Sequence, residues 1–232
     1  MYKISIYIIL FLATTLGANA QFSVSYTAGY GSYKMGDMKK LLESAFQIEQ
    51  GTMPAGLRIV DNFPAYVTQS VDFTYKRDRM EWGGTGTFMT TGGKIAYSDY
   101  SGKYVEKLTL TGYRIGATYR YYLSEGKLGK FPLLFYGEVS PAVTFTNLKY
   151  SAAVDIYEGN IHEEANDNVS TKAKGWSVLP ALGSKLFLTR KLALTANIGY
   201  DIEFGSKLST TGNTLRVDWS GLRLNGGATI MF

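Results

Sequence analysis

The sequence predicts an all-β fold: an eight-stranded antiparallel up-and-down transmembrane β-barrel with one amphipathic helix in its first external loop. Three observations lead to this prediction. Polar and apolar residues alternate with a period of two in eight segments of the 232-residue chain. The composition is rich in residues typical of strands and tight turns, with 18 Tyr, 12 Phe and 26 Gly against only 5 Pro. The first strand is preceded by an export signal.

The export signal occupies the first 20 residues. Lys3 supplies a positive start, residues 4–16 are almost wholly apolar, and Ala18-Asn19-Ala20 is a small-x-small cleavage pattern. The apolar run is shorter than the about 20 residues that a membrane-spanning helix needs. We therefore expect residues 1–20 to be a cleaved signal peptide and residues 21–232 to form one outer-membrane β-barrel domain. The chain has no cysteine, so no disulfide stabilises it.

The alternation is clearest in residues 192–204, where every second residue from Leu192 to Phe204 is apolar. Residues 133–146 show the same pattern. The other six segments are residues 22–30, 65–76, 80–88, 113–121, 176–188 and 222–232. Leu108 and Leu110, which precede the 113–121 segment, are out of phase with its apolar face, and this change of phase predicts a β-bulge.

Short and long connections alternate between these segments. Residues 77–79, 124–130 and 189–191 are short and charged, whereas the first and third of the other connections are long. Outer-membrane barrels have this rhythm, with short turns at one end and longer external loops at the other.

The first long loop contains a predicted helix over residues 37–50, with Asp37 as its N-cap. Apolar residues recur in it at spacings of three and four. Two interpretations stay open: a helix packed on the rim of its own barrel, or a lid or a surface for lipid or a partner. The apolar stripe consists of Met38, Leu41, Leu42, Ala45 and Ile48.

Periodicity alone does not say which face of the barrel meets lipid, since a soluble barrel with an apolar interior has the same period. The polar face carries five acidic and five basic residues. A narrow interior tolerates charges only when they are paired, so this balance favours the polar face as the lumen. Aromatic residues near both ends of the strands match interfacial girdles. The predicted lumen charges are Asp72, Lys76, Glu81, Arg114, Arg120, Glu138, Lys185, Asp201, Glu203 and Arg223.

The last segment, residues 222–232, ends in Phe232 with Ile230 two positions before it. It resembles the closing strand of bacterial outer-membrane proteins, which implies recognition by the barrel-assembly machinery. With the export signal and the alternation, the chain is similar to small eight-stranded OmpX-type or OmpA-domain barrels. This resemblance implies a location in the bacterial outer membrane. Its implied partners are outer-membrane lipid, lipopolysaccharide and other envelope proteins.

The acidic segment 155–167 is the one candidate cation site, because oxygen-rich clusters suit Ca²⁺ or Mg²⁺. It contains Asp155, Glu158, His162, Glu163, Glu164 and Asp167. Its residues show no ordered ligand spacing, so we expect a solvated loop and no metal. His162 is the sole histidine, and no serine motif accompanies it, so we predict no catalytic residue. The glycine-rich run 83–93 keeps strand spacing and is no phosphate loop.

The charges exclude one class of partner: 24 basic and 19 acidic residues are interspersed, without the basic stripe that nucleic acid requires. No cofactor is expected. The expected function is that of a non-enzymatic scaffold, a surface-interaction module or a subunit of an envelope complex. The alternatives are a barrel that binds or passes a small apolar molecule or lipid, and a lipid-modifying hydrolase. Eight strands leave an interior that side chains fill, which argues against a bulk pore.

Overall fold

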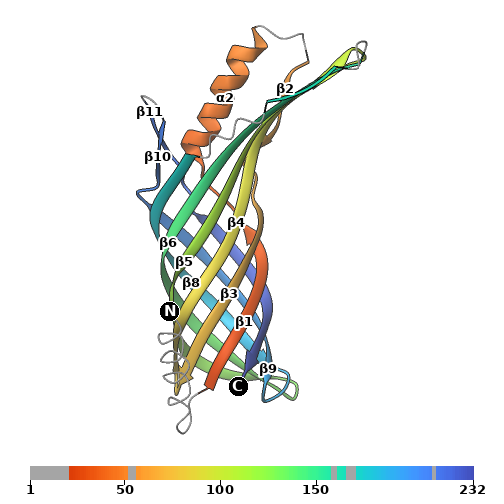
Figure 1. Ribbon diagram of the computed structural model, residues 1–232. Helices are drawn as coiled ribbons and strands as arrows, with labels where there is room; N and C mark the ends of the chain where they lie inside the picture. Colours follow the sequence, from red (N-terminus) through yellow and green to blue (C-terminus); the bar gives the residue numbers. More distant parts are fainter. Residues whose placement is uncertain (1–20, 52–55, 158–160, 166–170, 211–212) are drawn as a thin grey trace, which may run out of the picture.

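A closed ring of eight antiparallel strands forms the body of the molecule (Figure 1). The computed structural model describes residues 21–51, 56–157, 161–165, 171–210 and 213–232, and the predicted signal peptide lies outside them. The ring closes because β1 pairs with β3 on one side and β12 on the other. The predicted fold class is confirmed. In order around the ring the strands are β1 (Gln21–Gly31), β3 (Tyr66–Arg77), β4 (Met80–Ser98), β5 (Gly102–Leu128), β6 (Phe131–Ile156), β8 (Thr171–Phe187), β9 (Leu192–Phe204) and β12 (Gly221–Met231).

Three tight connections lie at one end of the ring, here called the turn end, and the other end is the loop end. The Phe232 amide donates a 2.9 Å hydrogen bond to the Phe22 carbonyl oxygen, which ties the last strand to the first at the turn end. The short link predicted over residues 124–130 is wrong in extent. Strand β5 continues to Leu128, beyond a register shift between Tyr122 and Ser124. That shift changes the phase of the side chains, which is why the pattern resembled a turn.

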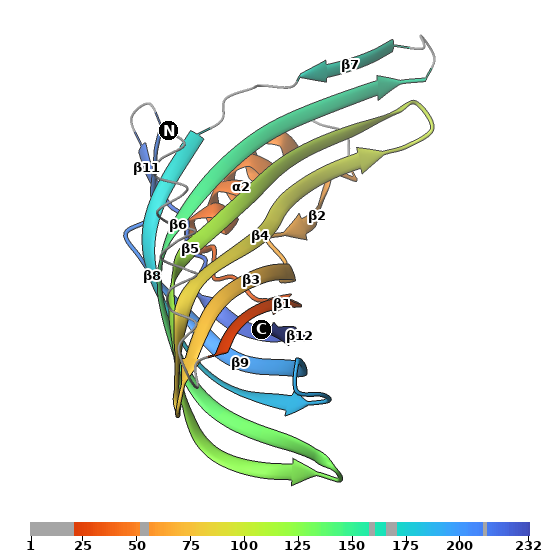
Figure 2. The ribbon, with the colours of Figure 1, turned by 60° about the horizontal axis from the view of Figure 1, so that its bottom comes forward.

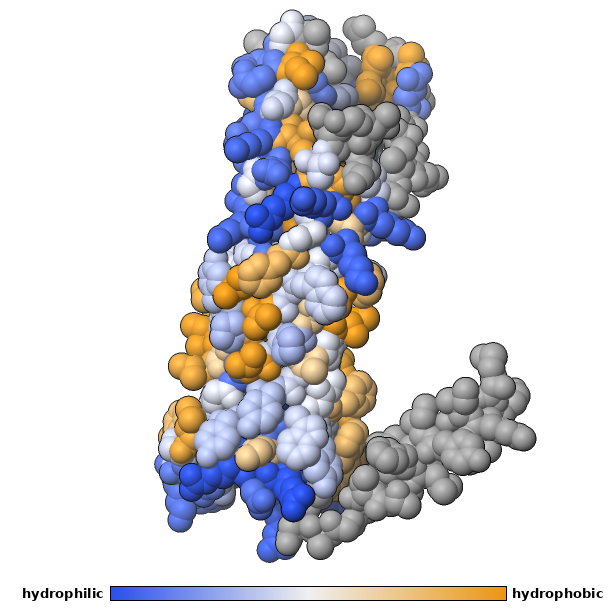
Figure 3. All heavy atoms as spheres, turned by 90° about the vertical axis from the view of Figure 1, so that its left-hand side faces the viewer, coloured by the Kyte–Doolittle hydropathy of each residue, from blue (hydrophilic) through white to orange (hydrophobic). Residues whose placement is uncertain are grey.

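Apolar side chains point outward from the ring and polar ones inward. Phe73, Ile115 and Leu182 are 54%, 59% and 62% exposed, whereas their neighbours Asp72 and Arg114 are buried. The outer surface therefore carries an apolar band, which Figure 3 shows around the middle of the barrel. This is the surface of a transmembrane barrel and the reverse of a soluble one, as the sequence predicted.

The bulge predicted at Leu108 and Leu110 is wrong. Pairing between β4 and β5 runs without a register shift from Met80 opposite Tyr121 to Ser98 opposite Lys103. Both leucines continue the inward face of β5 and are buried. The inward-facing residues change from polar to apolar at this height. The alternation of the strand continues unbroken, and only the polarity of its inward face changes.

A small unit with its own apolar core stands on the loop end of the ring (Figures 1 and 2). There β4, β5 and β6 continue beyond the ring and are flanked by β2 (Arg58–Asn62) and β7 (Ile161–Ala165). Helix α2 (Gly36–Gln50) lies against this sheet, and β10 (Lys207–Thr210) pairs with β11 (Asn213–Arg216) beside it. No helix in the described part of the chain is long and apolar enough to cross a membrane. The buried core includes Met38, Leu42, Phe63, Ile95, Leu110, Val217 and Trp219.

Helix α2 differs from its prediction at its start. Met35, in the left-handed conformation, occupies the N-cap position and makes no side-chain cap hydrogen bond. Asp37 lies in the first turn, where its Oδ2 accepts a 3.1 Å hydrogen bond from the Arg216 backbone amide. The expected capping role of Asp37 is therefore wrong. Met35 occupies the N-cap position, and the Asp37 carboxylate accepts its hydrogen bond from β11 instead of from the helix.

The apolar stripe of α2 packs on the molecule's own sheet. Met38 and Leu42 are fully buried, and Leu41 and Ala45 pack against the same core. Only Ile48, 74% exposed, faces away. The interpretation of the whole stripe as a surface for lipid or a partner is therefore wrong, and the alternative of a helix packed on its own barrel is the one observed.

Candidate functional site

The interior of the ring holds a dense network of charged side chains. Nine of the ten predicted lumen charges are buried. The tenth, Lys76, is half-buried at the turn end, where its Nζ lies 4.9 Å from the centre of the Tyr122 ring. The buried nine come from seven strands and are Asp72, Glu81, Arg114, Arg120, Glu138, Lys185, Asp201, Glu203 and Arg223.

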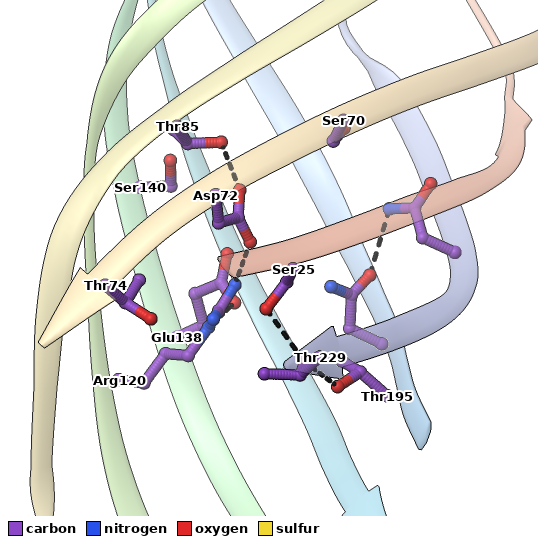
Figure 4. A network of polar contacts seen from close by, with 12 residues as sticks. Ser25, Ser70, Asp72, Thr74, Thr85, Arg120, Glu138, Ser140, Thr195 and Thr229 are labelled. Atoms are coloured by element: carbon purple, nitrogen blue, oxygen red, sulfur yellow. Dashed lines mark hydrogen bonds and ion pairs between the residues drawn. The ribbon is translucent and has the colours of Figure 1, made fainter. Parts of the chain in front are cut away.

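Arg120 is the centre of the cluster nearer the turn end. Its Nη2 lies 2.5 Å from Asp72 Oδ2, its Nη1 2.8 Å from Glu81 Oε1 and its Nε 2.7 Å from Glu138 Oε2. Figure 4 shows the contact with Asp72, whose other oxygen accepts a hydrogen bond from Thr85 at 2.7 Å. Three charge-assisted hydrogen bonds thus hold one guanidinium, which offsets the cost of burying it.

Lys185 crosses the lumen from β8 to β4, two strands that are not neighbours in the ring. Its Nζ lies 2.8 and 2.7 Å from the two carboxylate oxygens of Glu81. Thr74 donates a 2.9 Å hydrogen bond to the same carboxylate, and the Tyr122 hydroxyl donates another. These contacts bridge the lumen from the wall formed by β8 to the wall formed by β3, β4 and β5.

A second cluster, nearer the loop end, is built on Asp201. Its Oδ2 lies 3.5 Å from Arg114 Nε and 3.3 Å from Arg223 Nη2. Arg223 also donates to the Ser32 and Trp219 carbonyl oxygens at 2.8 and 2.7 Å. The second cluster therefore binds the two chain segments that enter and leave the loop-end unit.

Hydroxyl groups line the side of the lumen formed by β1, β12 and β9. Thr229 Oγ1 lies 2.8 Å from both Ser25 Oγ and Thr195 Oγ1, as Figure 4 shows. These small side chains leave room for the long arginine and lysine side chains from the opposite wall. The alternation in residues 22–30 puts Ser25 on the polar face, but serine and threonine carry no distinctive signal in an alternating strand, so no role for it could be predicted.

Apolar side chains close the loop end above the second cluster. Trp219 is 1% exposed, donates a 2.8 Å hydrogen bond from Nε1 to Thr146 Oγ1, and meets the Tyr33 ring edge-on at 4.9 Å. A Cβ on Gly112 would lie 2.9 Å from Trp219 Cζ2, so this glycine provides the space for the indole. The lumen is thus closed at two levels, by ion pairs and by an apolar plug.

The acidic segment is partly a strand. Residues 161–165 form β7, which pairs with β6 and places His162 opposite Asp155, with His162 Nδ1 in contact with Asp155 Oδ1. Glu158 and Asp167 lie outside the described residues. Within the described ranges, no group of three or more histidine or acidic side chains is placed to hold a metal ion. The expected loop is wrong for residues 161–165, which form a strand paired with β6, whereas the side chains of residues 161–163 are exposed to solvent as expected.

The closing strand places Ile230 and Phe232 on the outer face, 51% and 68% exposed. The Phe232 ring lies 6.1 Å from that of Phe22 across the seam between β12 and β1. Their role as an assembly signal stays a prediction.

No protein-family model matches the chain, and no curated protein sequence matches it. Solved structures similar to it are the attachment invasion locus protein Ail of Yersinia pestis (11% identity, 91% of this chain and 99% of that one, TM-score 0.37), Neisserial surface protein A (14%, 93% and 100%, 0.37) and the outer membrane protein OprG of Pseudomonas aeruginosa (13%, 93% and 96%, 0.46). The closed eight-strand ring and the outward apolar face of this chain agree with the resemblance to small outer-membrane barrels. Identities and TM-scores this low add nothing about function.

Proposed function

We propose that this protein is an outer-membrane barrel that anchors its loop-end unit at the cell surface, where the unit contacts a partner. The observation that best supports this proposal is the closed lumen beneath a folded unit at the loop end. Lys185 and Arg120 fill the barrel with ion pairs, and Trp219 closes it above them. A barrel closed at both levels is unsuited to transport, whereas a sheet and helix with their own core provide a rigid surface.

The outward apolar band supports the membrane location. Side chains such as Phe73, Ile115 and Leu182 would be costly in water and are stable against lipid acyl chains. The tip of the loop-end unit also exposes large side chains, among them Tyr100 at 92% and Tyr157 at 55%. Aromatic side chains of this kind are enriched where proteins meet partners.

The test combines conductance with site-specific cross-linking in whole cells. A photoreactive residue replaces Tyr100 at the tip of the β4–β5 hairpin, and the matched control replaces Leu128, which is 60% exposed at the turn end. We expect baseline conductance in planar bilayers and an adduct specific to position 100. Stable channel openings by the purified protein, or the absence of any such adduct, would overturn the proposal.

A second candidate function is the binding of a small apolar molecule at the turn end. A hollow of about 640 Å³ opens there, between the β5–β6 and β8–β9 connections. Its apolar lining includes Phe131, Leu134, Phe187 and Leu188. Mass spectrometry of the protein released from gently solubilised membranes tests this candidate: a bound lipid lost in Leu134→Glu supports it, and retention in that variant opposes it.

A further inference from the structure

The hollow at the turn end lies in the mouth of the lumen. Gln21 on β1, Leu134 on β6 and Phe187 on β8 all line it. Strands β1 and β6 are diametrically opposite in the ring, and each of the three residues keeps the inward phase of its strand. Figure 2 shows the β5–β6 hairpin and the β8–β9 turn side by side at this end. A hollow that joins opposite walls through inward-facing residues belongs to the interior of the barrel and not to its outer surface.

Aromatic and apolar side chains form the floor of this hollow. Tyr122, Leu134 and Tyr136 are buried in one cluster, and Phe187 packs against it. The Tyr122 and Tyr136 rings meet edge-on, with 5.7 Å between their centres. On the lumen side of this cluster, Arg120 Cζ lies 5.4 Å from the centre of the Tyr136 ring. The hollow is therefore a pocket whose apolar floor separates it from the charged network of the lumen.

Basic side chains surround the mouth of this pocket. Lys130 and Arg190 line it from two different connections, β5–β6 and β8–β9. Both are exposed, and neither forms an ion pair with any residue in the described ranges. Lys76, whose Nζ lies 4.9 Å from the centre of the Tyr122 ring at the floor, forms no ion pair with those residues either. Three cations from three parts of the ring thus stand around one apolar pocket.

The acidic residues of the turn end do not neutralise these cations. Segments 76–79, 124–130 and 189–191 contain seven basic residues and two acidic ones, Asp78 and Glu125. Glu125 is the register partner of Leu134, but it is exposed, lies outside the pocket lining and forms no ion pair in the described part of the chain. Among the described residues, none of those that line the pocket is acidic. The mouth of the lumen therefore has a positive potential, which favours an anion.

A pocket with apolar walls and cations at its rim suits a molecule with one alkyl chain and one anionic end. Its volume of about 640 Å³ is in the usual range for small-molecule pockets, about 300–1,000 Å³. A guanidinium binds a carboxylate through two parallel hydrogen bonds, and an ammonium group adds a further charged contact. We propose that this pocket binds a long-chain fatty acid, with the alkyl chain against Leu134 and Phe187 and the carboxylate between Lys130 and Arg190. The proposal rests on the second candidate function above, whose ligand it names.

The test uses the mature protein folded in a nonionic detergent and measures displacement of a fluorescent fatty acid. The competitors are hexadecanoic acid, hexadecanol and dipalmitoyl phosphatidic acid, each added at the same mole fraction in the micelles. The rim variant is Lys130→Gln with Arg190→Gln. Its matched control, Arg77→Gln with Lys127→Gln, removes the same charge from exposed positions outside the pocket. Heat-modifiable migration on gels and circular dichroism establish that each protein is folded.

We expect the rim variant to bind hexadecanoic acid at least about tenfold more weakly than the wild type, because contacts of two cations with the carboxylate are lost. It should bind hexadecanol as the wild type does, and the control variant should bind both ligands as the wild type does. An equal effect of the rim variant on acid and alcohol, or equal losses in the rim variant and its control, would overturn the fatty acid assignment but leave an apolar site. Tighter binding of the two-chain phosphatidic acid than of hexadecanoic acid would also overturn that assignment.

A second pair of variants tests the pocket itself. Leu134→Asn places an amide in the apolar wall, and Leu128→Asn is the control at a 60% exposed position outside the pocket. We expect Leu134→Asn to weaken the binding of acid and alcohol alike by at least about tenfold, because the alkyl chain loses its apolar contact. Wild-type affinity for both ligands in the folded Leu134→Asn protein would refute this pocket as the site, and the second candidate function with it.

Discussion

Replacement of Arg120 by Met is the sharpest test of the lumen network. Arg120 is 1% exposed and bonds to Asp72, Glu81 and Glu138 at 2.5 to 2.8 Å. Hydrogen bonds to charged groups are each worth about 1.5–3 kcal/mol, so three would sum to about 5–9 kcal/mol. Packing of the methionine side chain offsets part of this loss. Breaking a buried pair typically costs about 3–5 kcal/mol, which is the decrease in unfolding free energy that we expect.

The assay is urea unfolding of the barrel in lipid vesicles, followed by tryptophan fluorescence. Lys127→Met, at an exposed turn-end position, is the control and should change the free energy by less than about 0.5 kcal/mol. Asp72→Asn and Glu138→Gln, added to Arg120→Met, leave the Glu81–Lys185 pair balanced and should recover more than half of the loss. A cost below about 1 kcal/mol for Arg120→Met, or no recovery in the triple variant, would refute the view that paired charges hold the lumen.

Two further predictions concern the loop-end unit. Leu42→Ala, which removes a fully buried side chain from the contact between α2 and the sheet, should destabilise the unit by about 2–5 kcal/mol, whereas Ile48→Ala at the 74% exposed position should cost less than about 0.5 kcal/mol. Limited proteolysis of α2 compares the two. Glu106 lies on the loop-end part of β5. Burial raises its pKa to about 7, and the Glu49 carboxylate is the second cause of this increase. An unfolded glutamate has a pKa of about 4.3, so the contribution of Glu106 to stability is fully present below that pH and is lost as pH rises through 7. The amide-exchange protection of α2 should therefore decrease over this range. Glu106→Gln should remove this pH dependence.

The ring could be predicted from the sequence because its two faces meet environments of opposite polarity. Outward residues such as Phe73 are exposed on the barrel surface and inward ones such as Asp72 contact other polar groups, so each residue carries information about its side. The same pattern does not specify partners. For example, Lys185 reaches Glu81 across the lumen only because the ring closes and its strands tilt. The alternation of residues along the sequence gives no information about either property.

Two of the errors lie on β5 and have different physical causes. Leu110 faces inward like Arg114, but it belongs to the apolar core of the loop-end unit and not to the ion-pair network. At the other end of β5, the register shift after Tyr122 moves the side chains to the opposite face, so a paired strand resembled a loop. The stripe of α2 was correctly identified as apolar, yet the surface that covers it is formed by strands distant in the sequence, so its orientation could not be deduced.

The two levels of closure make a final prediction about transport. If ion pairs alone closed the lumen, Arg120→Met would open a path, because water would enter the space that the guanidinium group leaves. Trp219, Leu110 and α2, however, close the loop end independently of Arg120. We therefore expect Arg120→Met to lose stability but keep baseline conductance in planar bilayers. Channel openings in this variant at voltages where the wild type shows none would mean that the apolar plug does not seal the barrel. Such openings would favour transport over anchoring as the function.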